Sequence, residues 1–348
     1  MFHRRQALVN ADAMGSHKKK KKHGKKAKSS FTVELEFFWI GAFISLVESL
    51  PIKVAYSLGD VLASLAFSFD KRHRERTIQH ILHAEMAKNG REARRLAKKN
   101  FKSLARLGVD TFKIDSAIDR DNVHDHISLS GSPEALEMVF EKKKPIIAVA
   151  PHLANFAFIP TAYAIMTGNT MLSVIRPYDN PKLGEVMKGI QVRYGSEQCG
   201  QKGAMRRLFS ALKKGNSIGM VVDQHPGRKN GVLTTFFGHP ALTHSSPAML
   251  HLKTGVPICP VAMSQSSKPG TFEFVFKDPI VVEPSKDRDA DIALIAQKCT
   301  DAMEEFVREY PEQWFWSHRR WLDINRKGYD LDDLEKSLKK RKKHSAKK

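Results

Sequence analysis

A histidine at the end of an apolar run is the first candidate for chemistry in this chain. Residues Pro145 to Ala150 (PIIAVA) predict a buried strand, and Pro151 and His152 follow directly. Leu153 and the residues after it predict a helix, so His152 should stand where α/β proteins place their ligands. The positive end of that helix would disfavour imidazolium and keep the ring able to take a proton. A cap or a core histidine is the plainer alternative.

Two polar side chains could assist this histidine. Asp223 follows another apolar stretch, 217–222, and should reach the same carboxyl edge of the sheet, where its carboxylate could orient an imidazole. A helix or turn cap is the alternative role for Asp223. Asn155 is the second candidate, because asparagine orients the histidine of papain-like enzymes.

Alternating strands and helices should position these side chains. Apolar runs predict strands at 145–150, 171–175, 217–222, 256–263 and 272–276. Helices are expected at 181–193, 204–213, 247–253 and 289–310. Strands separated by helices indicate an α/β fold over residues 116–325.

The residues before this region predict helices at a membrane. The run 37–47 is apolar on all sides but too short to cross a hydrocarbon core, which takes roughly 20 helical residues. With the second apolar stretch 54–69, the flanking lysines and the aromatics at its start, it favours a helix that dips into or lies on the membrane. Packing on the protein core and an interrupted single span are the alternatives. We therefore expect a membrane-associated helical region at 33–115.

The charge of the chain is concentrated at its ends. The 58 Lys and Arg against 37 Asp and Glu leave a net charge of +21, with eight lysines in 18–28 and seven basic residues in 339–348. Such runs predict disordered basic tails, at 1–32 and 326–348, that could hold an associated protein on an anionic bilayer. The body shows no nucleic-acid-binding motif, so no nucleic acid is expected as a partner.

Cysteines and paired histidines give little sign of metal or disulfide chemistry. Cys199, Cys259 and Cys299 form no C-x-x-C pair, which suits a reducing cytoplasm. The histidine pairs 80/83 and 124/126 have no recognisable third ligand, so no metal is expected.

Seven blocks of sequence resemble the lauroyl/myristoyl acyltransferases of lipid A biosynthesis, a branch of the H-x4-[DE] glycerolipid acyltransferases. The blocks occur in the family's order and cover nearly the whole chain between the tails: PHLANFAF at 151–158, VIRPYDNPKL at 174–183, QKGAMRRL at 201–208, VVDQHPGRKNGV at 221–232, FFGHPALT at 236–243, TGVPICPV at 254–261 and PEQWFWSHRRW at 311–321. The resemblance implies a central mixed sheet flanked by helices, as in glycerolipid acyltransferases, preceded by N-terminal membrane-associated helices.

The resemblance also implies catalytic roles. His152 matches the family's base, which takes a proton from a hydroxyl as its oxygen attacks an acyl thioester. The family's orienting carboxylate lies five positions later, where this chain has Ala157. Loss of such a carboxylate typically costs about four orders of magnitude in rate. Either another acid replaces it, with Asp223 of the V-D-Q block a better candidate than Asn155, or catalysis is impaired, or Ala157 is an engineered substitution.

Further positions correspond to the family's substrate site. Arg176 matches the arginine that meets the phosphate of the acceptor, with an ion pair to Asp179 as its alternative role. Lys202 and Gly203 match a loop next to the acceptor, and Asn155 and Gln224 complete the expected binding residues.

The implied activity is acyl transfer from acyl carrier protein or coenzyme A, used as donor substrate without a further cofactor, to a hydroxyl of an anionic glycolipid. The acceptor expected is a lipid A precursor, with acyl carrier protein and the membrane surface as partners. The expected location is the cytoplasmic face of the bacterial inner membrane. Two alternatives are a catalytically impaired lipid-binding or scaffold relative, and an acyltransferase for another lysolipid.

Overall fold

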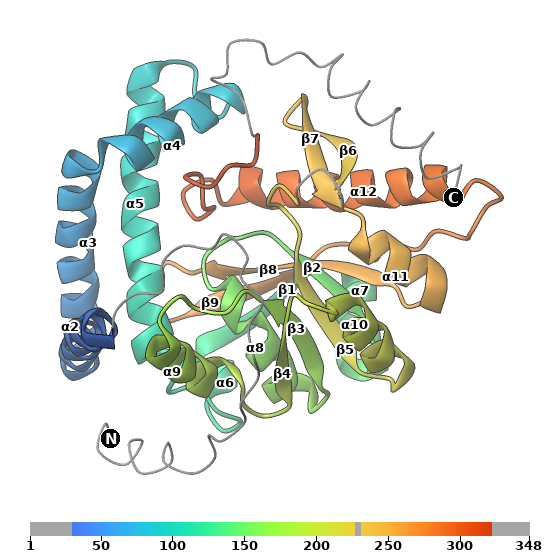
Figure 1. The fold of residues 1–348 in the computed structure, drawn as a ribbon, viewed down its shortest axis with the longest axis horizontal. Helices are drawn as coiled ribbons and strands as arrows, with labels where there is room; N and C mark the ends of the chain where they lie inside the picture. The colour runs from blue at the N-terminus through green and yellow to red at the C-terminus, as the bar shows by residue number, and fades with distance from the viewer. Residues whose placement is uncertain (1–29, 227–230, 322–348) are drawn as a thin grey trace.

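The computed structural model describes residues 30–226 and 231–321. The C-terminal basic tail and nearly all of the N-terminal one lie outside these residues, and the domain boundaries given above stay a prediction. The described chain is built around one large sheet with helices on both faces, and a group of N-terminal helices stands at one side (Figure 1).

The main sheet has seven strands in the order β1-β9-β8-β2-β5-β3-β4. All neighbouring strands pair in parallel except β8 and β9, so the sheet is mixed, as expected. The strands are β1 (Ile127–Gly131), β2 (Ile147–Ala150), β3 (Met171–Ile175), β4 (Ser196–Gly200), β5 (Ser217–Val221), β8 (Ile258–Gln265) and β9 (Phe272–Phe276). A separate antiparallel hairpin is formed by β6 (Gly231–Phe236) and β7 (His239–His244).

Two apolar cores lie on the two faces of the sheet. Alternate side chains of β2 divide between them, since Ile147 and Val149 enter one cluster and Ala148 and Ala150 the other. The first cluster is covered by α10 (Ala204–Lys213), α11 (Ser246–Thr254) and α12 (Arg288–Glu309). The second is covered by α7 (Pro133–Leu136), the π-helical turn η2 (Glu137–Glu141) and α8 (Ile159–Thr167). The other short helices are α6 (Val123–His126) and α9 (Pro181–Gln191).

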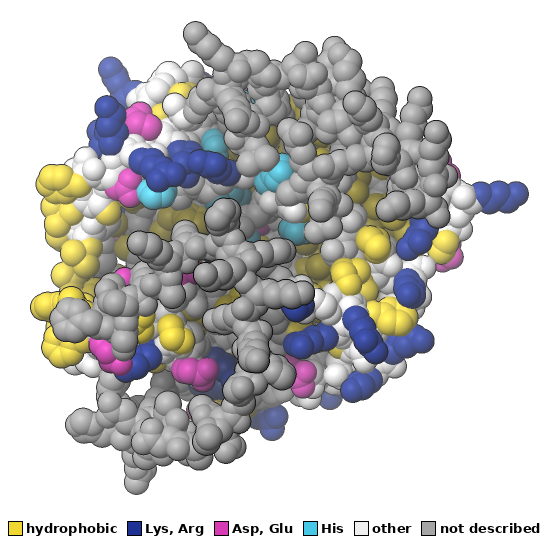
Figure 2. All heavy atoms as spheres, viewed as in Figure 1, with side chains coloured by type: hydrophobic (Ala, Val, Ile, Leu, Met, Phe, Trp, Pro, Cys, Tyr) yellow, Lys and Arg dark blue, Asp and Glu magenta, His cyan; other side chains and the backbone are white. Residues whose placement is uncertain are grey.

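The described part of the N-terminal region, from residue 30 on, has four helices: α2 (Ser30–Ser49), α3 (Ile52–Phe69), α4 (Lys71–His83) and α5 (Gly90–Lys113). Helix α3 packs along α5, where Arg106 donates to both oxygens of Asp60. The outward faces of α2 and α3 remain apolar, and Figure 2 shows their side chains at the edge of the molecule where Figure 1 places these helices. Exposed members include Phe38, Trp39, Leu46, Val61, Leu65 and Phe69.

Candidate active site

The backbone that carries His152 differs from the sequence prediction. A helix was expected from Leu153, but Leu153 forms a β-bridge with Trp314, and α8 begins only at Ile159 after a short 3-10 turn, η3 (Phe156–Phe158). The N–H of Ala154 donates to the carbonyl of Gln313. These inter-segment bonds take the place of the first helical turn, so the helix dipole, whose effect fades within one turn, cannot keep His152 neutral.

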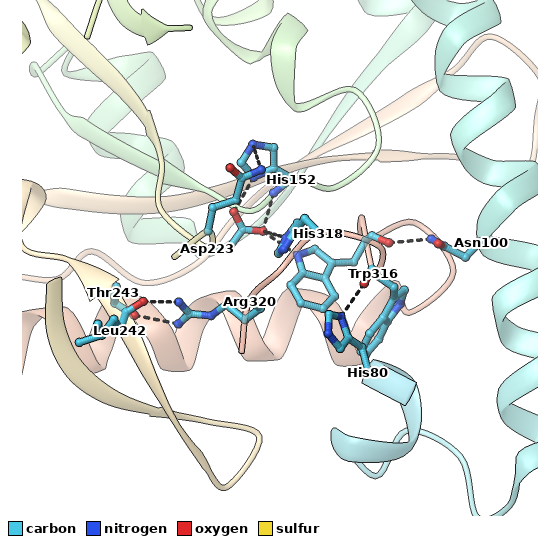
Figure 3. Close-up of polar contacts among 11 residues, drawn as sticks. His80, Asn100, His152, Asp223, Leu242, Thr243, Trp316, His318 and Arg320 are labelled. Atoms are coloured by element: carbon cyan, nitrogen blue, oxygen red, sulfur yellow. Dashed lines mark hydrogen bonds and ion pairs between the residues drawn. The ribbon is translucent and has the colours of Figure 1, made fainter. Parts of the chain in front are cut away.

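Parallel pairing of β2 with β5 brings His152 and Asp223 together, because both follow directly on neighbouring strands. Nδ1 of His152 lies 2.6 Å from Oδ1 of Asp223, and the backbone N–H of His152 donates to Oδ2 at 2.8 Å. Trp314 donates its Nε1–H to the same Oδ2 at 2.6 Å. Three N–H groups therefore hold the carboxylate of Asp223 in place, and it lies against the imidazole of His152 (Figure 3). The side chain of Asp223 is 1% exposed.

The environment of Asp223 favours its ionised form. Burial by itself raises the pKa of this carboxyl, but the charge and hydrogen bond of His152 oppose it, with His318 adding to the effect. The pKa of Asp223 is consequently held well below its usual range. A buried carboxylate that stays charged can stabilise an imidazolium formed beside it.

The other ring nitrogen of His152, Nε2, contacts the side chain of Gln224. Gln224 places its amide nitrogen 3.1 Å from Nε2, and the ring of Phe156 lies 4.7 Å from the imidazole centroid. An amide N–H can donate only to a nitrogen that carries a lone pair, so the arrangement fits the tautomer with its proton on Nδ1, toward Asp223. The side chain of His152 is 17% exposed. A hydroxyl that replaces the Gln224 amide at Nε2 would find a base in the correct tautomer.

Asn155 does not contact the imidazole. It is buried and donates its amide Nδ2–H to Oδ1 of Asp115 at 2.9 Å, so it links the turn after His152 to the end of α5. The alternative in which Asn155 orients His152 is therefore wrong. Ala157 lies half-buried in η3 and offers no polar group.

Arg176, Lys202 and Gly203 lie along the same edge of the sheet as His152. Arg176 follows β3, two strands from β2 in the sheet order, and Lys202 and Gly203 follow β4, the next strand. At about 4.8 Å per strand these positions are roughly 10 and 15 Å from His152 along the edge. The guanidinium of Arg176 is largely exposed and lies 4.0 Å from Asp179. All three could reach a large substrate spread across the strand ends.

The segment 313–321 contributes to the site in a way that the sequence did not predict. Its tryptophans Trp314, Trp316 and Trp321 are buried and pack on the core. His80 of α4 and Asn100 of α5 bond to the carbonyls of Trp316 and Trp314, so the N-terminal helices hold this segment in place.

Arg320 is a second anchor of the same segment. Its guanidinium is almost fully buried and donates to the carbonyl of Leu242 and the hydroxyl of Thr243 on β7 (Figure 3). Burial lowers the pKa of Arg320 to about 10, although the charge of Asp223 opposes the shift. The contacts explain the density of polar and aromatic residues in PEQWFWSHRRW, whose partners lie far away in the sequence.

One group of side chains within the described residues could hold a metal ion. Ligand atoms of His152, Asp223 and His318 lie within 4.8 Å of one another, a grouping that the sequence did not predict. Both oxygens of Asp223 already accept N–H groups. The arrangement therefore fits a histidine base with its orienting acid, since a metal would have to displace those bonds.

Comparison with known proteins identifies the class to which this fold and site belong. Residues 23–323 match the family of bacterial lipid A biosynthesis acyltransferases, and the chain belongs to that family. It is 24% identical to the lipid A biosynthesis lauroyltransferase of Escherichia coli K12, over 81% of this chain and 90% of that protein. It is 22% identical to the palmitoleoyltransferase of the same organism and to a lipid A biosynthesis acyltransferase of Haemophilus influenzae, with 82% and 85% of this chain covered and 90% of each relative.

Proposed function

We propose that this protein transfers a fatty acyl chain from an acyl thioester, carried by acyl carrier protein or coenzyme A, to a hydroxyl of an anionic glycolipid. The acceptor we propose is a lipid A precursor, by similarity to relatives whose names state lipid A biosynthesis. The observation that carries the proposal is the imidazole of His152, whose Nδ1 is held by a buried carboxylate and whose Nε2, beside the Gln224 amide, is the nitrogen left to act as the base.

The reaction follows from these two nitrogens. Nε2 of His152 takes the proton of the acceptor hydroxyl as its oxygen attacks the thioester carbonyl. The new C–O bond forms, the C–S bond breaks, and the departing thiolate takes the proton from the imidazolium. Asp223 stabilises that imidazolium throughout, so it supplies what the family's carboxylate would supply from position 157.

Ala157 favours a second candidate function, that of a lipid-binding relative with impaired catalysis. The two candidates differ in the use of His152. A binding protein needs no proton acceptor at the strand edge, whereas the enzyme depends on it. The bonds from His152 to Asp223 favour the enzyme.

The acceptor would lie along the strand ends. Arg176 could meet a phosphate with its forked guanidinium, and Lys202 could add a second positive charge beyond it. Gly203 has a positive φ of 74° at the start of α10, a conformation that suits glycine in such a loop.

We further propose that α2 and α3 place the protein on the cytoplasmic face of the bacterial inner membrane. Their outward faces expose large apolar side chains, among them Trp39 at 65% and Phe69 at 83%. Among the described residues, α3 is the one helix long and apolar enough to cross a bilayer, and 22% of it is buried in the protein. Two consecutive helices that both expose apolar side chains favour a contact within the membrane interface.

The test is acyl transfer by the purified full-length chain in detergent. The acceptor is a tetraacylated lipid A precursor, the donors are acyl carrier protein and coenzyme A thioesters of several chain lengths, and mass spectrometry reads the product. We expect one added acyl chain, which His152→Ala abolishes and His124→Ala, a change at an exposed histidine, leaves intact. No product from any donor, or equal product from His152→Ala, would contradict the proposal.

A further inference from the structure

His318 is a buried histidine whose ring has no hydrogen-bond partner in the part of the chain that the structure describes. Its side chain is 7% exposed, and both ring nitrogens are shielded from solvent without a partner among the described residues. Buried polar groups are nearly always paired, and leaving two unpaired costs free energy that an apolar side chain of the same size would avoid. Packing alone therefore does not explain why a histidine occupies this position.

The ring of His318 lies beside the carboxylate of the active site. Nε2 of His318 lies 3.6 Å from Oδ2 of Asp223 (Figure 3). The ring of His318 also meets the ring of His152 edge to face at 5.7 Å between centroids, so both imidazoles lie beside the same carboxylate. A shift of roughly half an ångström would bring the pair to hydrogen-bond distance. The ring of Trp314, which already donates to the same oxygen, meets His318 edge to face at 5.0 Å between centroids.

The charged surroundings favour an uncharged His318 that donates. Burial lowers the pKa of His318, and the nearby His152 and Arg320 act in the same direction, whereas Asp223 opposes them. His80 on α4 is a further neighbour, and burial lowers its own pKa to about 4. A neutral ring with its proton on Nε2 can still donate to Oδ2 of Asp223.

We propose that His318 is a positioning residue for the His152–Asp223 pair: its Nε2–H holds Oδ2 of Asp223 and withdraws negative charge from the carboxylate. The inference rests on the proposed role of His152 as the base. A further donor on Oδ2 weakens the pull of the Asp223 carboxylate on the Nδ1 proton of His152. The donor from His318 thereby limits how strongly Asp223 stabilises the His152 imidazolium. The imidazolium can then pass its proton to the departing thiolate.

The test compares His318→Gln, whose amide can still donate, with His318→Leu, which has similar bulk and no donor. The readout is the titration of the His152 ring by nitrogen-15 NMR in histidine-labelled protein, with the signal assigned by its loss in His152→Gln. In His318→Leu we expect the midpoint of His152 to rise by about half a pH unit, a threefold gain in proton affinity. His318→Gln should stay near the wild-type midpoint.

Leucine replaces a ring that makes no hydrogen bond within the described residues, so the variant should fold, and His318→Met provides a second donor-free side chain. An unchanged midpoint in both donor-free variants, or an equal shift in the glutamine variant, would overturn the proposal. The readout needs no turnover. A chain that transfers no acyl group but shows the expected shifts would refute the proposed function alone, whereas normal transfer with no shift would refute only the role of His318.

Discussion

Asp115 offers a quantitative prediction, because it is a fully buried carboxyl next to the turn that carries His152. It follows α5, is 3% exposed and accepts the amide of Asn155. Burial raises the pKa of Asp115 to about 8, helped by the nearby charge of Asp110, while Asn155 and Arg193 oppose the shift. The side chain should therefore be protonated in the folded protein at neutral pH.

The consequence for stability has a definite sign. The folded-state pKa of Asp115 lies above 3.8, the ordinary value for an aspartate, so between the two values unfolding releases a proton from Asp115. Its contribution to stability is complete below the unfolded pKa and is lost as the pH rises through the folded pKa. The loss is about 1.4 kcal/mol per pH unit, or roughly 3 kcal/mol from pH 5 to pH 7.

Asp115→Asn removes the titrating carboxyl group and keeps a side-chain oxygen that can accept the hydrogen bond from Asn155. We expect the free energy of unfolding of the wild type, relative to the variant, to fall by roughly 3 kcal/mol from pH 5 to pH 7. Urea unfolding in a non-ionic detergent, followed by tryptophan fluorescence, measures it. Asp278→Asn, at an exposed aspartate, is the control and should follow the wild type. Parallel pH dependences of wild type and Asp115→Asn would refute the reasoning.

Three other substitutions test separate parts of the site and surface. Ala157→Glu should leave acyl transfer unchanged or reduce it, because Asp223 already holds the imidazole and would be repelled by a second carboxylate. A tenfold gain in rate would show instead that the site lacks an acid. Trp314→Phe removes a charge-assisted hydrogen bond to Asp223, so the free energy of unfolding should drop by about 1.5–3 kcal/mol and the rate should fall; unchanged urea unfolding would contradict this. Phe69→Ser, at a side chain 83% exposed, should weaken binding to anionic vesicles in a sedimentation assay, and undiminished binding would count against the α3 face as the membrane contact.

The sequence predicted the central elements of the fold better than the peripheral ones. The bounds of β3, β9 and α10 agree with the sequence prediction, since each is a clear apolar or amphipathic run. The strands β1 and β4 were missed. Both lie at edges of the sheet, are partly exposed and have sequences, ISLSG and SEQCG, without a continuous apolar run.

The sequence predicted those site residues that directly follow a strand, and it did not predict the others. His152 and Asp223 could be predicted because each follows an apolar strand. Parallel pairing of β2 with β5 then brings the two side chains together. Trp314 lies 91 residues beyond Asp223 and reaches it through long-range packing. His318 belongs to the same distant segment. No periodicity in the sequence encodes such contacts, and for the same reason the turn at Leu153 was mistaken for a helix.

The central claim is that Asp223 replaces the carboxylate absent at position 157, and Asp223→Asn tests it most directly. The measurement is the single-turnover rate of acyl transfer, with circular dichroism and the unfolding temperature as checks of the fold. Asparagine can accept at one position but cannot stabilise an imidazolium as a carboxylate does, so we expect a fall of about three to four orders of magnitude. A folded Asp223→Asn variant whose rate stays within about threefold of the wild type, a difference of less than 1 kcal/mol in the barrier, would contradict the account.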